Sequence, residues 1–245
     1  MKEKYSAQCL KEKIIRLKEN IVTQITIAIL KPFYHHRMVD LENVRTDREN
    51  PLVFLGNHAE IYGPIASALC FPVPVRFWVI SRMMFNKKDV RAYLYENTFS
   101  KKKFLPVFVR KLLAWYLGWL SVNVMNSLQA IAVYRDSPMK LRQTIRESME
   151  ALSNGENLMI FPEHPEGKYI KGGISELSPG FLMLAEAWWK KYGKKLRIMP
   201  VFANREKRTF TFGNEIEYEP ENGYAAEQER ILNEAYEQLV HLSAR

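Results

Sequence analysis

A histidine and two other polar residues follow a short apolar run in the first third of the chain. The run Leu52–Leu55 is typical of a buried strand, and Asn57, His58 and Glu60 come soon after it. Because neutral histidine has a pKa near 6.5, His58 could accept the proton of a substrate hydroxyl, with a carboxylate to orient its ring. A surface turn with a capping asparagine explains the same residues about as well.

Polar residues also follow three other predicted strands; in chain order they are Arg82, Arg135, Glu163, Glu166, Gly167 and Lys168. Arg135 and Lys168 are expected at the same edge of the sheet as His58, because the carboxyl ends of parallel strands share one edge. Their cations could bind a phosphate group. Backbone N–H groups near Gly167 could stabilise negative charge on a reacting oxygen.

Apolar runs alternate with helical patterns through most of the chain. Strands are predicted at 52–55, 74–80, 130–134, 158–161, 196–202 and 209–212, and helices at 64–70, 138–152, 180–191 and 225–242. This alternation is typical of an α/β fold with a mixed, largely parallel sheet flanked by helices. No repeat or linker divides the sequence.

The composition restricts the partners. The 245 residues carry a net charge of +9, which favours polyanions such as nucleic acid, an anionic membrane or phosphorylated substrates. Nucleic acid is not expected as a partner, because the basic residues are scattered and no binding motif occurs. The two cysteines fit neither a disulfide framework nor a zinc spacing, so no metal site is predicted.

Two segments have the composition of membrane-contacting helices. Residues 8–31 place apolar residues three and four apart opposite a basic face, which suits an anionic bilayer surface, although such a helix can also pack on its own domain. Residues 105–124 are apolar and rich in Trp and Tyr, which favour a bilayer interface or a buried helix. We expect an N-terminal amphipathic, membrane-associating segment at 1–40 and an α/β domain at 41–245.

Four sequence blocks, in order, resemble those of the phospholipid and glycerol acyltransferases of the lysophosphatidic acid acyltransferase type. The blocks are Asn57–Gly63, Ala130–Asp136, Phe161–Lys168 and Ile198–Phe202, and the strand and glycine at Phe210–Ile216 also match. The similarity covers roughly residues 50 to 241. It implies the α/β fold of that family and a site built from these loops.

The sequence departs from the family pattern in two places. The first block of the family is Asn-His, four residues, then Asp, and that aspartate falls on Gly63 here. The third block, usually Phe-Pro-Glu-Gly, here carries His164-Pro165 after Glu163, before a second glutamate in Glu166-Gly167-Lys168. Glu163 is preferred over Glu166 for the family's glutamate because it follows the strand directly. Either of them, or Glu60, could orient His58 in place of the missing aspartate, and Glu60 could instead cap the following helix.

The resemblance implies transfer of a fatty acyl chain from a thioester donor to a hydroxyl of a lysophospholipid or a glycerol-phosphate-like acceptor, with His58 as general base. Acyl-CoA or acyl carrier protein would be the donor substrate, and no cofactor is expected. The protein is expected at the cytoplasmic face of a membrane, peripheral or monotopic. The alternative is a catalytically impaired protein of the same fold that binds lipid or acyl carrier.

Overall fold

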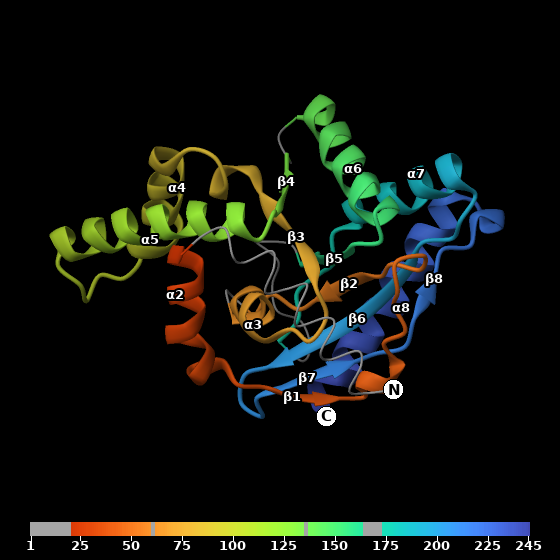
Figure 1. The fold of residues 1–245 in the computed structure, drawn as a ribbon, viewed down its shortest axis with the longest axis horizontal. Coiled ribbons are helices and arrows are strands. Elements are labelled where there is room, and N and C mark those ends of the chain that lie inside the picture. Colours follow the sequence, from red (N-terminus) through yellow and green to blue (C-terminus); the bar gives the residue numbers. More distant parts are fainter. Residues whose placement is uncertain (1–20, 60–61, 135–136, 164–172) are drawn as a thin grey trace. The chain divides into compact units, whose positions relative to one another are not determined.

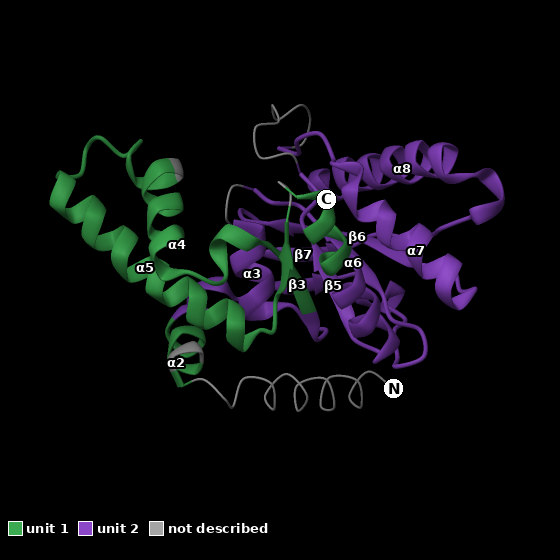
Figure 2. Cartoon of the chain, turned by 90° about the horizontal axis from the view of Figure 1, so that it is seen from above, with its two compact units in different colours: residues 1–29, 76–144 green, residues 30–75, 145–245 purple. Residues whose placement is uncertain are grey.

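The computed structural model describes residues 21–59, 62–134, 137–163 and 173–245. The chain forms two compact units, residues 1–29 with 76–144 (unit 1) and residues 30–75 with 145–245 (unit 2), as Figure 2 shows in colour. Helices α2 (Ile21–Leu30) and α6 (Pro138–Ser153) each cross a boundary between them. The predicted division near residue 40 stays a prediction.

Unit 2 contains a sheet with the strand order β1-β7-β6-β2-β5, with β8 paired to the start of β6 (Figure 1). Its strands are β1 (Arg37–Val39), β2 (Val53–Gly56), β5 (Asn157–Ile160), β6 (Arg197–Asn204), β7 (Thr209–Phe212) and β8 (Ile216–Glu217). Strand β6 runs antiparallel to β7 and β8, and the other pairs are parallel. The sheet is therefore mixed and largely parallel, as predicted.

The helices of unit 2 cover this sheet. They are α3 (Tyr62–Cys70), α7 (Leu182–Tyr192) and α8 (Tyr224–Ala244), with short 3-10 turns η1 (Lys31–Tyr34), η2 (Leu41–Asn43), η5 (Pro179–Phe181) and η6 (Pro220–Asn222). Helices α3 and α8 both pack on β6, and α8 runs behind that strand in Figure 1. The four helices predicted from periodicity all form, with ends shifted by a few residues.

Strand β2 is central, and its surroundings explain why the chain folds there. All four of its residues are buried, and it pairs in parallel with β5 on one side and β6 on the other. Phe54 packs edge to face against Phe71 and Phe212, which belong to an aromatic cluster with Phe210. Burial of such large rings is a major source of stability. The loop that carries His58 thus leaves the sheet from a fully buried strand.

Unit 1 contains a parallel strand pair and a helical hairpin. Its elements are β3 (Val75–Ile80), η3 (Ser81–Met83), α4 (Lys87–Leu94), the π-helical turn η4 (Tyr95–Phe99), α5 (Val107–Ser127) and β4 (Ile131–Val133). Strand β3 pairs with β4, and α4 packs on α5. Sequence patterns missed α4, which starts where the Asn86 side chain accepts a hydrogen bond from the Lys88 backbone N–H. They also missed the short strands β1 and β8.

Within the part of the chain that the structure describes, no helix is both long enough and apolar enough to cross a membrane. Helix α5 has 21 residues, but its apolar stretch is interrupted by charges. The predicted N-terminal helix is described only from Ile21 onward, as α2.

Candidate functional site

Three loops of unit 2 leave the sheet at one edge. Gly56 at the end of β2 is in register with Val201 of β6, and Leu55 is in register with Ile160 at the end of β5. The residues after β2, β5 and β6 therefore emerge side by side at what we call the carboxyl edge. His58 and Glu163 are both there, as expected of a parallel arrangement.

Asn57 fixes the start of the β2 loop. Its side chain is 1% exposed; its Oδ1 accepts the Ala203 N–H at 2.7 Å and its Nδ2 donates to the Ala203 carbonyl at 3.3 Å. The amide thus copies the backbone pairing of a strand and extends the β2–β6 contact by one residue. This geometry suits positioning of the neighbouring His58 and leaves the amide facing the protein.

Glu163 ties the His58 loop to a distant segment. Its Oε1 accepts the backbone N–H of His58 at 2.6 Å, and its Oε2 accepts the backbone N–H of Ser175 at 3.2 Å and the Ser175 hydroxyl at 3.1 Å. The carboxylate is 4% exposed, and Glu163 also forms a β-bridge with Leu177. Glu163 therefore holds the backbone of His58, whereas the sequence suggested contact with its ring.

The His58 loop is strained. Ala59 has φ of 41°, in the left-handed region that a residue with a Cβ adopts at a cost of about 1–2 kcal/mol. The ring of His58 lies edge to face with Phe161, the residue after β5, at 5.8 Å between ring centres. Backbone strain of this kind gathers at functional sites, where surrounding contacts enforce it.

Gly63 has no room for any side chain. A Cβ built on it would lie 2.0 Å from the carbonyl oxygen of Asn57, a backbone atom that cannot move aside alone. A hydrogen bond from the Gly63 N–H to the His58 carbonyl, at 3.2 Å, brings the backbone of Gly63 close to the loop after β2. The family's aspartate at this position is thus incompatible with the observed loop, and restoring it requires the loop to change.

Other predicted site residues are not placed together by the structure. Arg82 lies in η3 of unit 1, whereas His58 belongs to unit 2. Five predicted residues lie outside the described part of the chain: Glu60, Arg135, Glu166, Gly167 and Lys168.

The structure adds a buried pair that sequence patterns missed. His36 is 5% exposed; its Nδ1 bonds the Tyr34 carbonyl and its Nε2 lies 2.7 Å from the Tyr62 hydroxyl. Because a carbonyl only accepts, Nδ1 carries the proton and Tyr62 donates to Nε2. Burial lowers the pKa of His36 and raises the pKa of Tyr62, so both stay neutral near pH 7. The pair ties the start of α3 to the segment before β1.

Arg205 is the cation that sequence reading overlooked at the carboxyl edge. It follows β6 directly, its side chain is exposed, and its guanidinium carbon lies 5.8 Å from the centre of the Tyr62 ring. Asn204 stabilises the turn after β6, because its Oδ1 accepts the backbone N–H groups of Glu206 and Lys207. The only sequence signal was its position after a predicted strand.

Nothing among the residues described marks a metal site: they hold no group of three or more His, Cys, Asp or Glu side chains placed to bind an ion. Unit 2 has a groove of about 300 Å³, but none of its lining residues is a predicted site residue. The lining comprises Asp40, Asn43, Phe212, Gly213, Asn214, Glu237, Gln238, His241, Leu242 and Arg245.

Comparison with known proteins gives a likeness among solved structures but none among sequence families. No protein-family model matches the sequence, and no curated protein matches it. Among solved structures, the chain is similar to the 1-acyl-sn-glycerophosphate (LPA) acyltransferase PlsC from Thermotoga maritima, with a TM-score of 0.52 and 16% sequence identity. The alignment covers 96% of this chain and 83% of the other. The likeness supports an acyltransferase-like α/β fold.

Proposed function

We propose that this protein is an acyltransferase that moves a fatty acyl chain from a thioester donor to a hydroxyl of a lysophospholipid or glycerol-phosphate-like acceptor. The observation that carries the proposal is the His58 loop, strained at Ala59 and held by Glu163 at the carboxyl edge. It occurs in a chain with the fold of an LPA acyltransferase.

The proposed chemistry gives His58 the role of general base. The acceptor oxygen attacks the thioester carbonyl carbon while the imidazole takes the hydroxyl proton. The tetrahedral intermediate then collapses, the carbon–sulfur bond breaks, and the leaving thiolate receives the proton from the imidazolium. Acyl-CoA or acyl carrier protein is the proposed donor substrate, and the reaction needs no further cofactor.

Glu163 is the proposed positioning residue of this site. Its carboxylate holds the His58 backbone N–H at 2.6 Å, so it fixes the loop where an aspartate at position 63 cannot fit. In the part of the chain that is described, the three groups bonded to it are uncharged, so its negative charge is not balanced by a bonded cation. Such a charge near the loop favours a protonated imidazole in the transition state. Glu60 and Glu166 remain proposed as additional contributors.

A phosphate on either substrate needs cations. Arg135, Lys168 and Arg82 remain proposed for that role, with backbone N–H groups near Gly167 proposed for the thioester oxygen. Arg205 is added to this set because it is exposed beside Tyr62. It comes five residues after Pro200, which pairs with Leu55 of β2.

The proposed location is the cytoplasmic face of a membrane, with the protein bound as a peripheral or monotopic species. The N-terminal segment 1–40 is proposed to contribute, because Ile21, Ile25 and Ile29 on α2 are exposed at a spacing of four residues. Such a row forms one apolar helix face.

The test is acyl transfer by the purified full-length protein, with acyl-CoA or acyl carrier protein as donor and lysophosphatidic acid or glycerol 3-phosphate as acceptor. His58→Ala should lower kcat about 10²- to 10⁴-fold with an unchanged melting temperature. His241→Ala, at an exposed histidine of α8, is the matched control and should keep full turnover. Full turnover of His58→Ala would remove His58 as the base.

A catalytically impaired protein that binds lipid or acyl carrier is the second candidate, and Gly63 is the observation that favours it. In that case the wild-type protein should bind an acyl-CoA or a lysolipid but release no free thiol from the donor. Thiol release measured alongside donor binding therefore separates the two functions.

A further inference from the structure

Helix α5 of unit 1 packs closely against α4. Ala114, Gly118 and Val122 are buried on one face of α5, at steps of four residues. A Cβ at Gly118 would lie 2.7 Å from the Cγ of Arg91, so α4 and α5 approach closely there. The hairpin therefore uses a small residue for its closest internal contact, and several larger apolar residues of α5 remain exposed. Trp115 is partly covered, because the guanidinium carbon of Arg91 lies 5.1 Å from the centre of its ring.

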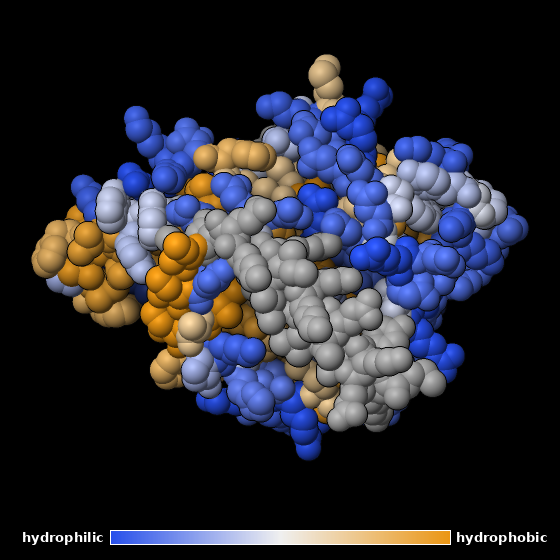
Figure 3. Space-filling view, in the orientation of Figure 1, coloured by the Kyte–Doolittle hydropathy of each residue, from blue (hydrophilic) through white to orange (hydrophobic). Residues whose placement is uncertain are grey.

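Those larger residues form an exposed stripe. Phe108, Leu112, Trp115 and Tyr116 follow the i, i+4, i+7, i+8 spacing of one helix face and are 72%, 61%, 51% and 50% exposed. Phe104, in the loop before α5, is 78% exposed. In Figure 3 the tip of the hairpin, at the left, is coloured orange, the hydrophobic end of the scale. A contiguous aromatic surface of this kind is characteristic of an interaction site.

The chain segment that carries the stripe is basic. Residues 101–127 contain five basic residues (Lys101, Lys102, Lys103, Arg110 and Lys111) and no Asp or Glu. The three consecutive lysines and Lys111 are exposed, next to Phe104 and Phe108. Exposed aromatic rings beside lysines suit a surface that is apolar inside and negatively charged outside.

We propose that the α5 face, defined as Phe104, Phe108, Leu112, Trp115 and Tyr116 with the flanking lysines, docks on an anionic lipid bilayer. The helix lies in the plane of the headgroups, because it is interrupted by charges and does not meet the requirements of a spanning helix. Pairing with a second copy of the same face is disfavoured, since it would bring two lysine clusters together. The inference names the membrane partner of the proposed function and rests on it only for the lipid nature of the acceptor.

The test is flotation of the full-length protein with vesicles of phosphatidylcholine alone or of equal parts phosphatidylcholine and phosphatidylglycerol. The double variant Phe108→Ser/Trp115→Ser should lower binding to the anionic vesicles about tenfold or more. Replacing the three lysines 101–103 by glutamine should remove most of the preference for phosphatidylglycerol. The matched control is Met139→Ser/Met183→Ser, which removes two exposed apolar side chains from other helices and should bind as wild type.

Equal vesicle binding by the Phe108/Trp115 variant and the wild type overturns the proposal. A concentration-dependent dimer that this variant abolishes, seen by light scattering without lipid, also overturns it, because the face would then bind a second copy. Turnover of short-chain, water-soluble substrates tests the acyltransferase proposal independently of membrane binding. The variant should retain that turnover, and a wild type without any turnover but with normal vesicle binding would refute the acyltransferase function alone.

Discussion

The described residues of unit 2 include two buried carboxylates near opposite edges of one sheet, and their partners differ in charge. Glu227 on α8 is fully buried and accepts hydrogen bonds from the Glu219 backbone, the Asn222 amide and the Arg230 guanidinium. It lies near the start of β6, because Tyr218, next to Glu219, bonds the carbonyl of Leu196. Burial acts to raise the pKa of Glu227, but hydrogen bonds from Arg230, Asn222 and the Glu219 backbone outweigh it and lower the pKa to about 2.

Glu163 is nearly as buried but is bonded by His58 and Ser175 groups that carry no charge. A carboxylate that forms an ion pair with an arginine has its charge neutralised by that partner, and the pair contributes to the stability of the fold. A carboxylate held by neutral donors keeps its charge available to a proton acceptor nearby. Glu227 is thus bound by a cation, whereas Glu163, among the residues that the structure describes, is bound by uncharged groups.

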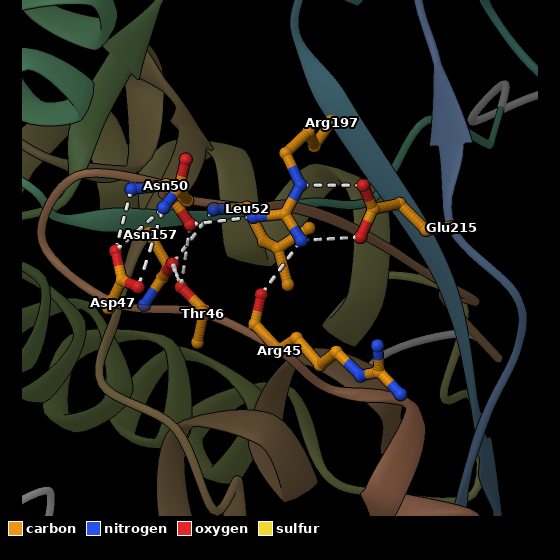
Figure 4. A network of polar contacts seen from close by, with 8 residues as sticks. All are labelled: Arg45, Thr46, Asp47, Asn50, Leu52, Asn157, Arg197 and Glu215. Atoms are coloured by element: carbon orange, nitrogen blue, oxygen red, sulfur yellow. Dashed lines mark hydrogen bonds and ion pairs between the residues drawn. The ribbon is translucent and has the colours of Figure 1, made fainter.

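The rest of the amino edge, where β2, β5 and β6 begin, is also occupied by polar groups that bind backbone (Figure 4). The Oδ1 atom of Asn157 accepts the Leu52 N–H at 2.8 Å and the Thr46 hydroxyl at 2.6 Å. Arg197 makes an ion pair with Glu215 and donates to two loop carbonyls. Polar residues at strand ends thus occur at both edges, and the carboxyl edge combines the strained Ala59 and the crowded Gly63 in one loop.

The largest effect is expected at Gly63. Gly63→Ala should destabilise the protein by about 3 kcal/mol or more and abolish turnover, because the new Cβ would be forced against the Asn57 carbonyl. Gly180→Ala is the control, since its nearest atom would be the Ser178 hydroxyl at 3.9 Å. Urea unfolding of both variants measures the difference. A stable and active Gly63→Ala protein would mean that the loop is adaptable and that position 63 can accept the family's aspartate.

A smaller loss, confined to catalysis, is expected at Glu163. Glu163→Gln replaces one acceptor by an N–H group that faces an N–H donor, and it removes the negative charge near His58. We expect kcat to fall about 10- to 100-fold, with a stability loss of about 1–3 kcal/mol. Glu176→Gln, an exposed neighbour, should change neither kcat nor stability. If Glu163→Gln lowers stability but keeps the wild-type kcat, Glu163 has a structural role alone.

At Glu227 the effect should be on stability alone and should depend on pH. The folded pKa of about 2 is below the unfolded value of 4.5, so the ionised carboxylate stabilises the fold above pH 4.5, and this contribution is lost as the pH falls toward 2. Glu227→Gln should therefore be less stable than wild type by about 1–3 kcal/mol at pH 7, and the gap should narrow below pH 4.5. Turnover should be unchanged at temperatures where the variant is folded. A gap independent of pH would contradict the depressed pKa.

Much of the fold follows from local patterns, whereas much of the site does not. The strands at β2, β3, β5, β6 and β7 were predictable because each is a short apolar run bounded by polar residues or turns. The proximity of Glu163 to His58 was predictable from parallel strand order. Its bond to the His58 backbone was not, because it depends on how the loop bends at Ala59. The crowding at Gly63 was likewise not predictable from the sequence, since the obstructing atom is a backbone oxygen six residues earlier.

The smallest expected effect concerns the two arginines at the ends of β6, one at each edge of the sheet. Arg205 is exposed just beyond the strand's carboxyl end, over the Tyr62 ring, whereas Arg197 at its start is bound to Glu215 and to the carbonyls of Asn50 and Arg45. Arg205→Ala should raise KM roughly 3- to 10-fold and leave stability unchanged, as expected for one exposed contact to a phosphate.

The substrate whose KM rises identifies the phosphate that Arg205 contacts. A rise for lysophosphatidic acid alone assigns the acceptor, and a rise for acyl-CoA alone assigns the donor. Arg197→Ala should do the opposite: it should lower stability by about 1–3 kcal/mol, because two loop carbonyls and Glu215 lose their donor, and it should leave both KM values unchanged. If Arg205→Ala keeps both KM values, the cation that meets the phosphate must come from another loop.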